Sequence, residues 1–600
     1  MCGIAGIWRT QDIKRIGSDL KKMTDSIVHR GPDGEGHWLD EDAGIGFGHR
    51  RLSIIDLSQN GHQPMFLEER YVITFNGEIY NYLEIKAELE AKGYSFKSKS
   101  DTEVLLVAYH EWGESCLTKL DGMFSFALFD KDKKELFCAR DRFGEKPFFY
   151  YNDQNTFAFG SEMKELFSIG IPKEVDEQML FLYLNYDVVE NPHDKSQTFY
   201  KNIIQLPASC SMKMNSDRII TIKKYWQLDT KVTSFLSEKE SSERFLELFD
   251  ESLQRRMRSD VPTGASLSGG VDSSSIVSSV ASMYPDAAFS TFTARFDDKN
   301  YDEGQHIAKL KERYNLNTFD CYPSSDQIKK DLDKIFYHQE EPFGSTSVIA
   351  QWEVMKLARK NDTIVLLDGQ GADETLGGYF KYFIPFLSEL KSKSDYKSQL
   401  LAIENHLDVS PFLSKKESLR MKSPTTFDKF ADLSRKFRSS SLSNDLNPEF
   451  IHQFKNEPSP FHRDNTLNSF LHNDIFKYGL GKLLRFSDRN SMAHSVEVRL
   501  PYLSHELVEF AFSLESKYKI WDGWTKRILR KSMENRVPND ILYRKDKKGF
   551  QAPKSWLEQK DSLDIIDASF KTLKENGIVT EQIKSNHWKY IMAAKLMKNG

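Results

Sequence analysis

"TGASLSGGVDSSSIVSSVASMY", residues 263–284, is the stretch that indicates the fold most clearly. Its first part, 263–268, predicts a buried strand, and the run from Ser273 onward predicts a helix. Gly269 and Gly270 between them allow a tight turn and a close approach of the backbone to a ligand. The helix start offers free N–H groups and the positive end of the helix dipole, which suit a phosphate group. This order predicts a phosphate-binding edge of a sheet.

The polar side chains of the turn strengthen this prediction. Ser268, Ser273 and Ser274 supply hydroxyl donors. Asp272 would repel a phosphate, so its presence predicts a Mg²⁺ ion between the two. No G-K-[ST] follows, so the turn is not a Walker A loop. The alternative is a Gly-Ser turn that only caps a helix, and the full S-G-G-V-D-S-S run behind a strand disfavours it.

A second glycine-rich turn follows another predicted strand in "TIVLLDGQGADETLGGY", residues 363–379. In a parallel sheet both turns would lie at the same edge, where ligands bind. Asp373 can then supply a second carboxylate for the metal, opposite Asp272. The alternative for Asp373 and Glu374 is helix N-capping, which is common for these residue types.

The region around these turns alternates between helices and strands. Helices are predicted at 240–257 and 349–360, and a further strand at 289–296. This alternation predicts an α/β domain with a parallel sheet. After about Tyr379 the pattern is mostly helical.

The first 200 residues or so read differently, as strands with short helices. "EVLLVAYHEWG" (103–113) predicts an amphipathic helix that ends at Gly113. "GMFSFALFD" (122–130) and "ELFCARD" (135–141) flank a polar turn and predict a β-hairpin. A segment at 206–237, with a small hairpin, is expected to connect the two regions. The predicted domains are therefore 2–205 and 238–600.

Composition excludes several classes of protein. The chain has 83 basic and 88 acidic residues, a net charge of −5, so nothing favours nucleic acid or an anionic membrane as partner. No run approaches the roughly 20 apolar residues of a membrane span, and no basic leader precedes a long apolar stretch. The five cysteines form no C-x-x-C pair, which argues against a zinc or disulfide framework. A cytoplasmic protein is expected.

One cysteine stands apart, because the chain begins "MCGIAGIW". If Met1 is removed, the Cys2 thiol lies beside a free α-amino group. A thiol with its own base nearby can act as a nucleophile.

Further motifs along the chain bear on the role of Cys2. "HRGPDGEG" (29–36), "RRLSIIDLS" (50–58), "FNGEIYN" (75–81) and "SKSDTE" (98–103) resemble the glutaminase domain of class II glutamine amidotransferases. The second region adds "RNSMAHSVEVRLPYL" (489–503), "DGWTKRILRKSM" (522–533) and "KKGFQAPKSWL" (547–557). With "LSGGVDSS", these motifs resemble the family of glutamine-hydrolysing asparagine synthetases over nearly the whole chain.

The resemblance implies the fold class. The first domain is expected to be an α+β N-terminal nucleophile hydrolase, an αββα sandwich. The second is expected to be an α/β ATP-pyrophosphatase domain with a parallel sheet and a largely helical C-terminal part.

The resemblance also implies roles in the first domain. Cys2 would attack the side-chain amide of glutamine, and its α-amino group would take the thiol proton. Asn76 and the backbone N–H of Gly77 would stabilise the oxyanion. The planar fork of Arg51 suits the carboxylate of glutamine. The glutamine-binding residues implied are Arg51, Leu52, Ser53, Ile54, Ile55, Asn76, Gly77, Glu78 and Asp101, of which Glu78 and Asp101 suit the ammonium group.

In the second domain, ATP and a carboxylate acceptor would form an acyl-adenylate, which ammonia from the first site attacks. The implied substrates are glutamine, ATP, and aspartate or another carboxylate. Lys526 would offset phosphate charge, and Asp272 and Asp373 would hold Mg²⁺. The implied ATP-binding residues are Leu267, Ser268, Gly269, Gly270, Asp272, Ser273, Ser274, Ala294, Asp368 and Gly369. The oligomeric state stays open, with a homodimer among the alternatives.

One departure from the family pattern concerns the second turn. The family usually has S-G-E-G-[AS]-D-E, whereas this chain has Asp368 and Gln370 where the serine and first glutamate stand. Glutamine cannot accept a proton as a carboxylate does. Asp368 could replace the missing carboxylate, because residues i and i+2 of an extended stretch share a side. We therefore count both among the candidate catalytic residues.

This departure leaves three hypotheses open. The first is an enzyme that amidates aspartate. The second is the same chemistry on another acceptor, such as a sugar acid or a peptide-like metabolite. The third is a non-catalytic relative, which the presence of Cys2, Asn76 and Asp101 disfavours.

Overall fold

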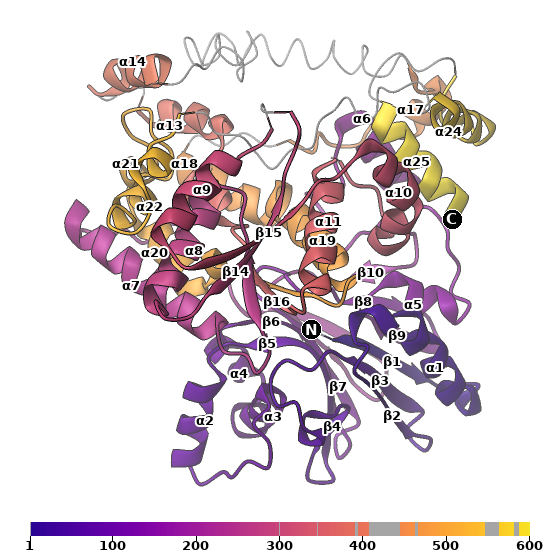
Figure 1. Cartoon of the computed structure of the whole chain (residues 1–600). Helices are drawn as coiled ribbons and strands as arrows, with labels where there is room; N and C mark the ends of the chain where they lie inside the picture. The colour runs from indigo at the N-terminus through magenta and orange to yellow at the C-terminus, as the bar shows by residue number, and fades with distance from the viewer. Residues whose placement is uncertain are drawn as a thin grey trace.

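A computed structural model describes residues 2–298, 301–344, 346–390, 394–406, 445–461, 466–545, 563–580 and 587–599 (Figure 1). The motif "KKGFQAPKSWL" (547–557) lies outside these ranges. Among the described residues, no helix is long and apolar enough to cross a membrane.

The N-terminal half contains two antiparallel sheets of six strands each. The first has the order β10-β8-β9-β1-β3-β2 and the second the order β12-β11-β7-β6-β5-β4. The strands of the first sheet are β1 (Gly3–Arg9), β2 (Gly34–Asp40), β3 (Ile45–Arg51), β8 (Phe149–Asn152), β9 (Thr156–Gly160) and β10 (Ile204–Gln205). Those of the second are β4 (Met65–Leu67), β5 (Tyr71–Ile79), β6 (Gly122–Asp130), β7 (Glu135–Arg140), β11 (Cys210–Met214) and β12 (Ile220–Lys224).

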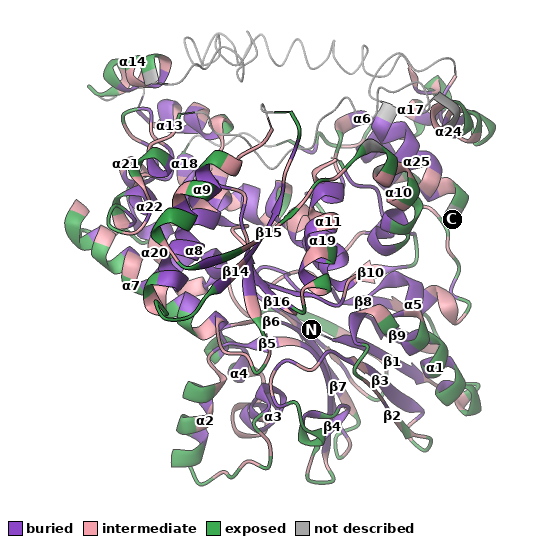
Figure 2. Ribbon diagram, viewed as in Figure 1, coloured by how far each residue is buried: buried purple, intermediate pink, exposed green. Residues whose placement is uncertain are grey.

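Helices cover the outer faces of these sheets. α1 (Ile16–Ser26) packs on β1 and β3, and α5 (Met163–Ser168) packs on β9. α3 (Asp101–Trp112) packs on β4 and β5 of the second sheet, α2 (Tyr82–Ala91) packs on α3, and β1 and β5 pack face to face. The central strands β1, β5 and β6 are buried on both faces, because the sheets pack on each other and helices cover their outer sides, and the sheets are the most buried part of this half (Figure 2). The predicted αββα sandwich is confirmed.

The local predictions for this half can be checked directly. α3 ends at Trp112 and is capped by Gly113, as predicted. β6 and β7 form the predicted hairpin. The hairpin expected in the connecting segment is β11–β12, and β11 pairs with β7. The second sheet therefore continues beyond residue 205 to Lys224.

The C-terminal half is built on a five-stranded parallel sheet of order β15-β14-β13-β16-β17. Its strands are β13 (Thr263–Ser266), β14 (Phe289–Ala294), β15 (Leu316–Cys321), β16 (Val365–Leu367) and β17 (Glu497–Arg499). α8 (Val271–Met283) contacts β13 and β14, whereas α11 (Ser347–Lys360) contacts β14 and β15. α7 (Glu238–Arg256) packs outside α8. The predicted α/β domain is confirmed, with β15 and β17 as strands that the sequence pattern did not reveal.

Helices follow the sheet, in agreement with the expected helical C-terminal part. They include α12 (Ala372–Leu376), α13 (Phe383–Leu390), α14 (Tyr396–His406), α17 (Pro448–Gln453), α18 (Leu467–Asn473), α19 (Leu480–Met492), α20 (His505–Ser513), α22 (Arg527–Ser532), α24 (Leu563–Glu575) and α25 (His587–Asn599). α19 carries one of the contacts with the N-terminal half. Asp488 of α19 accepts two hydrogen bonds from the buried Arg30, at 2.9 and 3.1 Å. A buried ion pair of this kind ties the two halves together.

Candidate functional site

Cys2 lies immediately before β1, and 9% of it is exposed. Its backbone N–H donates to Asn76 Oδ1 at 3.1 Å, and its carbonyl accepts from Arg30 Nε at 3.1 Å. Its Sγ lies 3.9 Å from the carbonyl oxygen of Leu52. Burial raises the pKa of the thiol, while the contact with Leu52 and the charge of Arg51 oppose that rise. The backbone of Cys2 is thus held from both sides, and its thiol lies beside a positive charge.

Asn76 stands on β5, in the sheet opposite Cys2. Its Oδ1 faces Cys2, but its Nδ2 is buried without a hydrogen-bond partner among the described residues. Such a buried donor is costly to leave unpaired, so it is poised to bind an oxygen that a substrate brings. Gly77 follows with a φ of 156°, and a Cβ there would lie 2.1 Å from the carbonyl oxygen of Met123. The pair predicted to form the oxyanion site therefore lies beside the nucleophile.

The predicted glutamine-binding segment wraps this position. Arg51 donates to the carbonyl oxygens of Ser58, at 2.8 Å, and Asp56, which fixes its guanidinium near Cys2. Ser53 N–H donates to Asp33 at 2.8 Å. Ile54 and Ile55 are drawn instead into apolar contacts between the two halves.

The two predicted acids, Glu78 and Asp101, are both buried. Asp101 accepts a hydrogen bond from Ile79 N–H at 2.9 Å, and burial raises its pKa to about 6. Burial and the neighbouring Glu497 raise the pKa of Glu78 well above its usual value. Arg499 lies 3.5 Å from Glu78 and 2.6 Å from Glu497. The first site thus contains a buried cluster of ionisable side chains: Glu78, Asp101, Glu497 and Arg499.

Sequence reasoning missed Glu497 and Arg499, which belong to β17 of the other half. Both stand in the motif at 489–503, so the signal was present without a role attached to it. The first site is therefore completed by residues that lie more than 400 positions away along the chain.

The second site lies at the carboxyl edge of the parallel sheet. β13 and β16 are neighbours, so the turns that follow them meet, as predicted. Lys526 Nζ lies 2.5 Å from Asp272 Oδ2 and 2.6 Å from Asp373 Oδ1. Lys526 has a φ of 52° just before α22, and a Cβ on Gly378 would come within 2.1 Å of Lys526 Cε. The sequence analysis placed Asp272 and Asp373 near each other, as the structure does. It did not predict that Lys526 forms ion pairs with both.

A cavity of about 460 Å³ opens at this edge. Its volume falls in the range of about 300–1,000 Å³ typical of small-molecule sites. Eight of the predicted ATP-binding residues line it: Leu267, Ser268, Gly270, Asp272, Ser273, Ala294, Asp368 and Gly369. Gly269 and Ser274 do not. Arg530 and Arg544, which sequence reasoning missed, add two cations to the lining.

Asp368 and Gln370, the two residues of the second turn that differ from the family pattern, also line this cavity. Burial raises the pKa of Asp368 to about 6, although hydrogen bonds from the backbone of Gly369 and Gln370 oppose this. Gln370 Oε1 is buried with no hydrogen-bond partner among the described residues. Glu374 accepts a hydrogen bond from Tyr379 at 2.8 Å, and burial raises its pKa to about 7. The cavity is thus lined by two carboxyl groups with pKa values of about 6 and about 7. It is also lined by one buried amide oxygen that has no hydrogen-bond partner among the described residues.

An apolar cluster connects the regions of the two sites. It contains Leu52, Ile54, Tyr80 and Met123 from the N-terminal half, with Val365 and Met492 from the C-terminal half. Leu52 touches the Cys2 thiol through its carbonyl, and Val365 begins the strand that leads to the second turn. Packed apolar side chains therefore extend from the residue that contacts the thiol to the strand that precedes the second turn.

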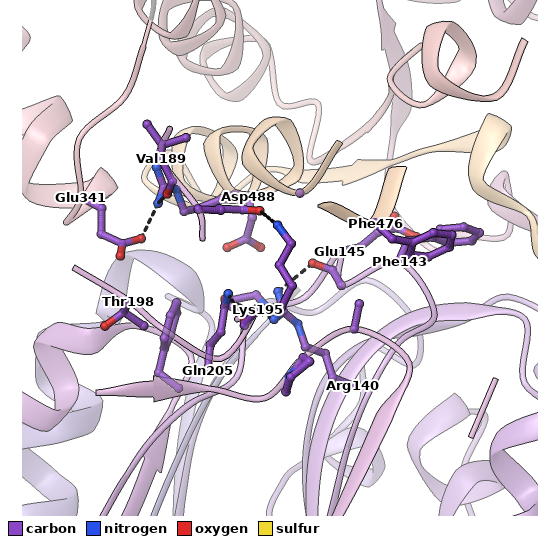
Figure 3. A pocket seen from close by; sticks show the side chains of 18 of the residues that line it. Arg140, Phe143, Glu145, Val189, Lys195, Thr198, Gln205, Glu341, Phe476 and Asp488 are labelled. Atoms are coloured by element: carbon purple, nitrogen blue, oxygen red, sulfur yellow. Dashed lines mark hydrogen bonds and ion pairs between the residues drawn. The ribbon is translucent and has the colours of Figure 1, made fainter. Parts of the chain in front are cut away.

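A second cavity, of about 70 Å³, lies between the halves (Figure 3). Two ion pairs line it: Lys195 with Glu190 at 2.7 Å, and Arg485 with Glu341. It belongs to neither site and forms a polar part of the interface.

Comparison with known proteins agrees with this two-site arrangement. Residues 1–226 match the glutamine amidotransferase domain family, and residues 244–595 match the asparagine synthase family. The chain belongs to the asparagine synthase family.

Named relatives cover most of its length. Glutamine-hydrolysing asparagine synthetase 1 of Bacillus subtilis is 34% identical over 93% of this chain and 88% of that protein. Glutamine-hydrolysing asparagine synthetase 3 of the same organism is 30% identical over 91% and 86%. Amidase chry2 of Gibberella zeae is 25% identical over 91% and 86%. Membership of the asparagine synthase family thus extends over both halves.

Proposed function

We propose that the chain makes asparagine from aspartate, with glutamine as nitrogen donor and ATP as energy source. The observation that carries this proposal is the pairing of Cys2 with Asn76, whose Nδ2 is an unsatisfied buried donor. Family membership and the named relatives support aspartate as the acceptor. The reaction divides between the two sites.

At the first site, removal of Met1 would leave the α-amino group of Cys2 to take the thiol proton. The thiolate attacks the amide carbon of glutamine, and the carbonyl oxygen becomes an oxyanion. Asn76 Nδ2 and Gly77 N–H donate to it. The C–N bond then breaks, and the α-amino group returns its proton to the leaving ammonia. Water hydrolyses the thioester to glutamate and restores the thiol.

The ammonia must then reach the second site without being protonated. The cluster around Leu52, Met123, Val365 and Met492 supports a dry route, because ammonium would lose its hydration there at a large cost. An uncharged ammonia molecule crosses such a region more easily.

At the second site, the β-carboxylate of aspartate attacks the α-phosphorus of ATP, and pyrophosphate leaves. Lys526 and Arg530 offset the negative charge that accumulates. Ammonia then attacks the acyl carbon, AMP leaves, and the attacking nitrogen loses a proton. Asp368 and Glu374 support this last step, because both are carboxyl groups with a pKa of about 6 to 7.

The donor set also fits a Mg²⁺ ion. Asp272 and Asp373 direct carboxylate oxygens at one cationic group, Lys526 Nζ, and oxygen ligands of this kind suit Mg²⁺. When bound there, the ion would neutralise phosphate charge. The two carboxylates would hold it, and Lys526 would remain beside them to contact a phosphate oxygen.

The location proposed is the cytoplasm. All five cysteines are free thiols, and the proposed chemistry needs Cys2 reduced. A reducing compartment meets that need.

The test is product analysis on the full chain with glutamine, aspartate, ATP and Mg²⁺. We expect asparagine, glutamate, AMP and pyrophosphate in equal amounts. Formation of ADP and phosphate, or glutamine hydrolysis with no asparagine at any aspartate concentration, would contradict the proposal.

The acceptor can be tested separately through the second turn. The double change Asp368→Ser with Gln370→Glu restores the usual family pattern. If Asp368 already serves in aspartate amidation, the single change Asp368→Asn should slow amide formation and the double change should recover it. If wild type is slow with aspartate and the double change speeds it, the natural acceptor is another carboxylate.

A further inference from the structure

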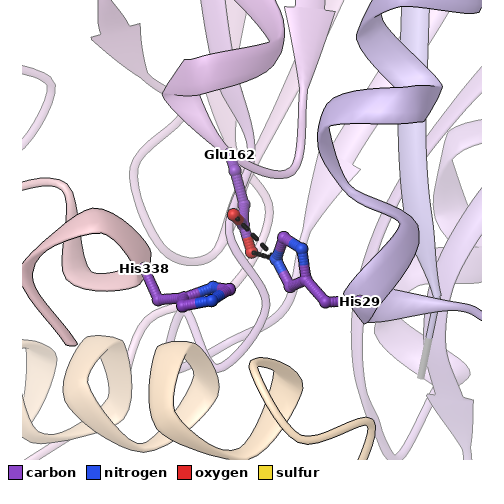
Figure 4. A group of neighbouring side chains, drawn as sticks. All are labelled: His29, Glu162 and His338. Carbon is purple, nitrogen blue, oxygen red and sulfur yellow. Dashed lines mark hydrogen bonds and ion pairs between the residues drawn. The ribbon is translucent and has the colours of Figure 1, made fainter. Parts of the chain in front are cut away.

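Two histidines and a glutamate meet at the interface between the halves, apart from both sites (Figure 4). His29 lies in the short turn η2 (Val28–Arg30), and Glu162 precedes α5. His338 reaches them from α10 (Ser325–Gln339) of the other half. One ligand atom from each side chain lies within 4.8 Å of the other two. His29 Nε2 is already 3.1 Å from Glu162 Oε1.

This group is enclosed. Glu162 is 1% exposed and His338 is 7% exposed. His338 Nδ1 is buried and makes no hydrogen bond to any described residue. The ring of His338 packs edge-on against His29, with centroids 4.5 Å apart. His338 therefore has an unpartnered nitrogen and lies beside a second imidazole and a carboxylate, which makes it available as a ligand.

We propose that His29, Glu162 and His338 bind one zinc ion that clamps the N-terminal half to the C-terminal half. Two histidines and one glutamate are a ligand set that zinc uses, with bonds of about 2.0–2.1 Å. Ligand atoms around a tetrahedral zinc lie roughly 3.4 Å apart by that bond length. His29 and Glu162 are already near this spacing, at 3.1 Å, and His338 lies within 4.8 Å of both, so it has to move by at most roughly 1.5 Å.

The competing charge at the site is Lys164. Its Nζ pairs with Glu162 and lies 3.6 Å from Glu340. Arg30 and Arg489 also contact Glu162, but Arg30 pairs with Asp488 and Arg489 with Glu340 at 2.8 Å. Zinc on Glu162 would therefore displace the lysine toward Glu340. Removing the positive charge of Lys164 should strengthen zinc binding.

A zinc ion here would act on the arrangement of the halves. His29 and Glu162 belong to one half and His338 to the other, so the ion cross-links them. Arg30, the residue after His29, donates to the carbonyl of Cys2. The clamp would thus also steady the support of the nucleophile.

The test measures zinc bound to the full chain after treatment with a chelator and dialysis. We expect wild type to bind one equivalent more than His338→Gln and His29→Gln. Each comparison cancels zinc held at Cys2 or at Asp272, since all variants keep those residues. Zinc should raise the unfolding temperature of wild type by several degrees, with no such rise in His338→Gln.

Two further variants guard against a folding artefact. His494→Gln is the matched control, because His494 is another histidine of low pKa in the same half but lies outside the cluster. It should bind as wild type does. Lys164→Met should bind zinc several-fold more tightly, a gain that misfolding cannot produce. Equal zinc binding by wild type and His338→Gln, loss in His494→Gln, or no gain in Lys164→Met would overturn the proposal.

Discussion

Cys2 immediately precedes β1 and faces Asn76 on β5 of the other antiparallel sheet, whereas Asp272, Asp373 and Lys526 lie at the starts of the helices α8, α12 and α22 near the edge of the parallel sheet. At the first site neither Cys2 nor Asn76 takes part in an ion pair with another described side chain. The Nδ2 donor of Asn76 has no hydrogen-bond partner among the described residues. At the second, Asp272 and Asp373 already share a cationic partner, Lys526.

The difference follows from the chemistry each site must support. An oxyanion forms only during the reaction, so its donor has to be kept free by rigid strands. A triphosphate is already charged when it binds, so its site has to hold cations before the substrate arrives. The position of the site at the edge of the sheet allows these cations to be exchanged. The first site should therefore fail when one atom is removed, and the second when its charge balance is changed.

The largest expected effect is that of Cys2→Ala. Glutamine hydrolysis should fall by at least about 10³-fold, since no other group can form the thioester. Asparagine formation from added ammonia should persist, because the second site contains no thiol. Glutamate release and ammonia-dependent synthesis are measured side by side, with Cys138→Ala as the control for a buried thiol elsewhere. Parallel loss of both activities would show that the sites are not separable in this way.

The mirror experiment is Lys526→Met. It removes the cation between Asp272 and Asp373, so pyrophosphate release should fall by about 10²–10³-fold. Glutamine hydrolysis should change little. Pyrophosphate and glutamate are assayed on the same preparation, and the exposed Lys531, one turn further along, gives the control Lys531→Met. A greater loss of glutamine hydrolysis than of pyrophosphate release would reverse the assignment.

Arg499→Met is designed to break the comparison. Arg499 belongs to the C-terminal half but pairs with Glu497 and Glu78 beside the thiol. Its loss removes the cation that these two buried carboxylates share, which costs about 3–5 kcal/mol of unfolding free energy. Denaturant unfolding measures that cost, and glutamine hydrolysis should fall more than ammonia-dependent synthesis. If only synthesis suffers, the first site does not depend on the other half.

The smallest effect concerns pH and Asp101. Burial raises its pKa to about 6, so the folded chain holds this proton more tightly than the unfolded chain does. The stability that the proton provides is complete below about pH 4 and is lost as the pH rises through about 6. Asp101→Asn should therefore gain up to roughly 3 kcal/mol over wild type at pH 8 and nothing at pH 4.

The same residue gives a kinetic readout. If Asp101 binds the ammonium group of glutamine as a carboxylate, KM for glutamine should rise as the pH falls below about 6. The KM for added ammonia, corrected for its protonation, should not follow. A flat KM for glutamine between pH 5 and pH 8 in wild type would remove Asp101 from the binding site.

Local pattern was enough to predict each building block. Residues 263–284 predicted strand, turn and helix because periodicity and glycine act over a few neighbouring residues. Cys2, Asn76 and Gly77 were recognised from short motifs, and the structure brings them together. The two nucleotide-site turns met as expected, because parallel strands end at one edge.

What the sequence left undetermined depends on contacts between distant residues. β17 has only three residues and carries no periodic signal, yet it delivers Glu497 and Arg499 to the first site. Lys526 could be read as a phosphate ligand, but its pairing with both acids follows from the packing of α22 near the sheet edge. His29 and His338 lie 309 positions apart, and only the docking of the two halves makes them neighbours. Local sequence determines which elements form, whereas burial and pairing across the interface decide which side chains share a site, because those energies exist only once the elements have packed.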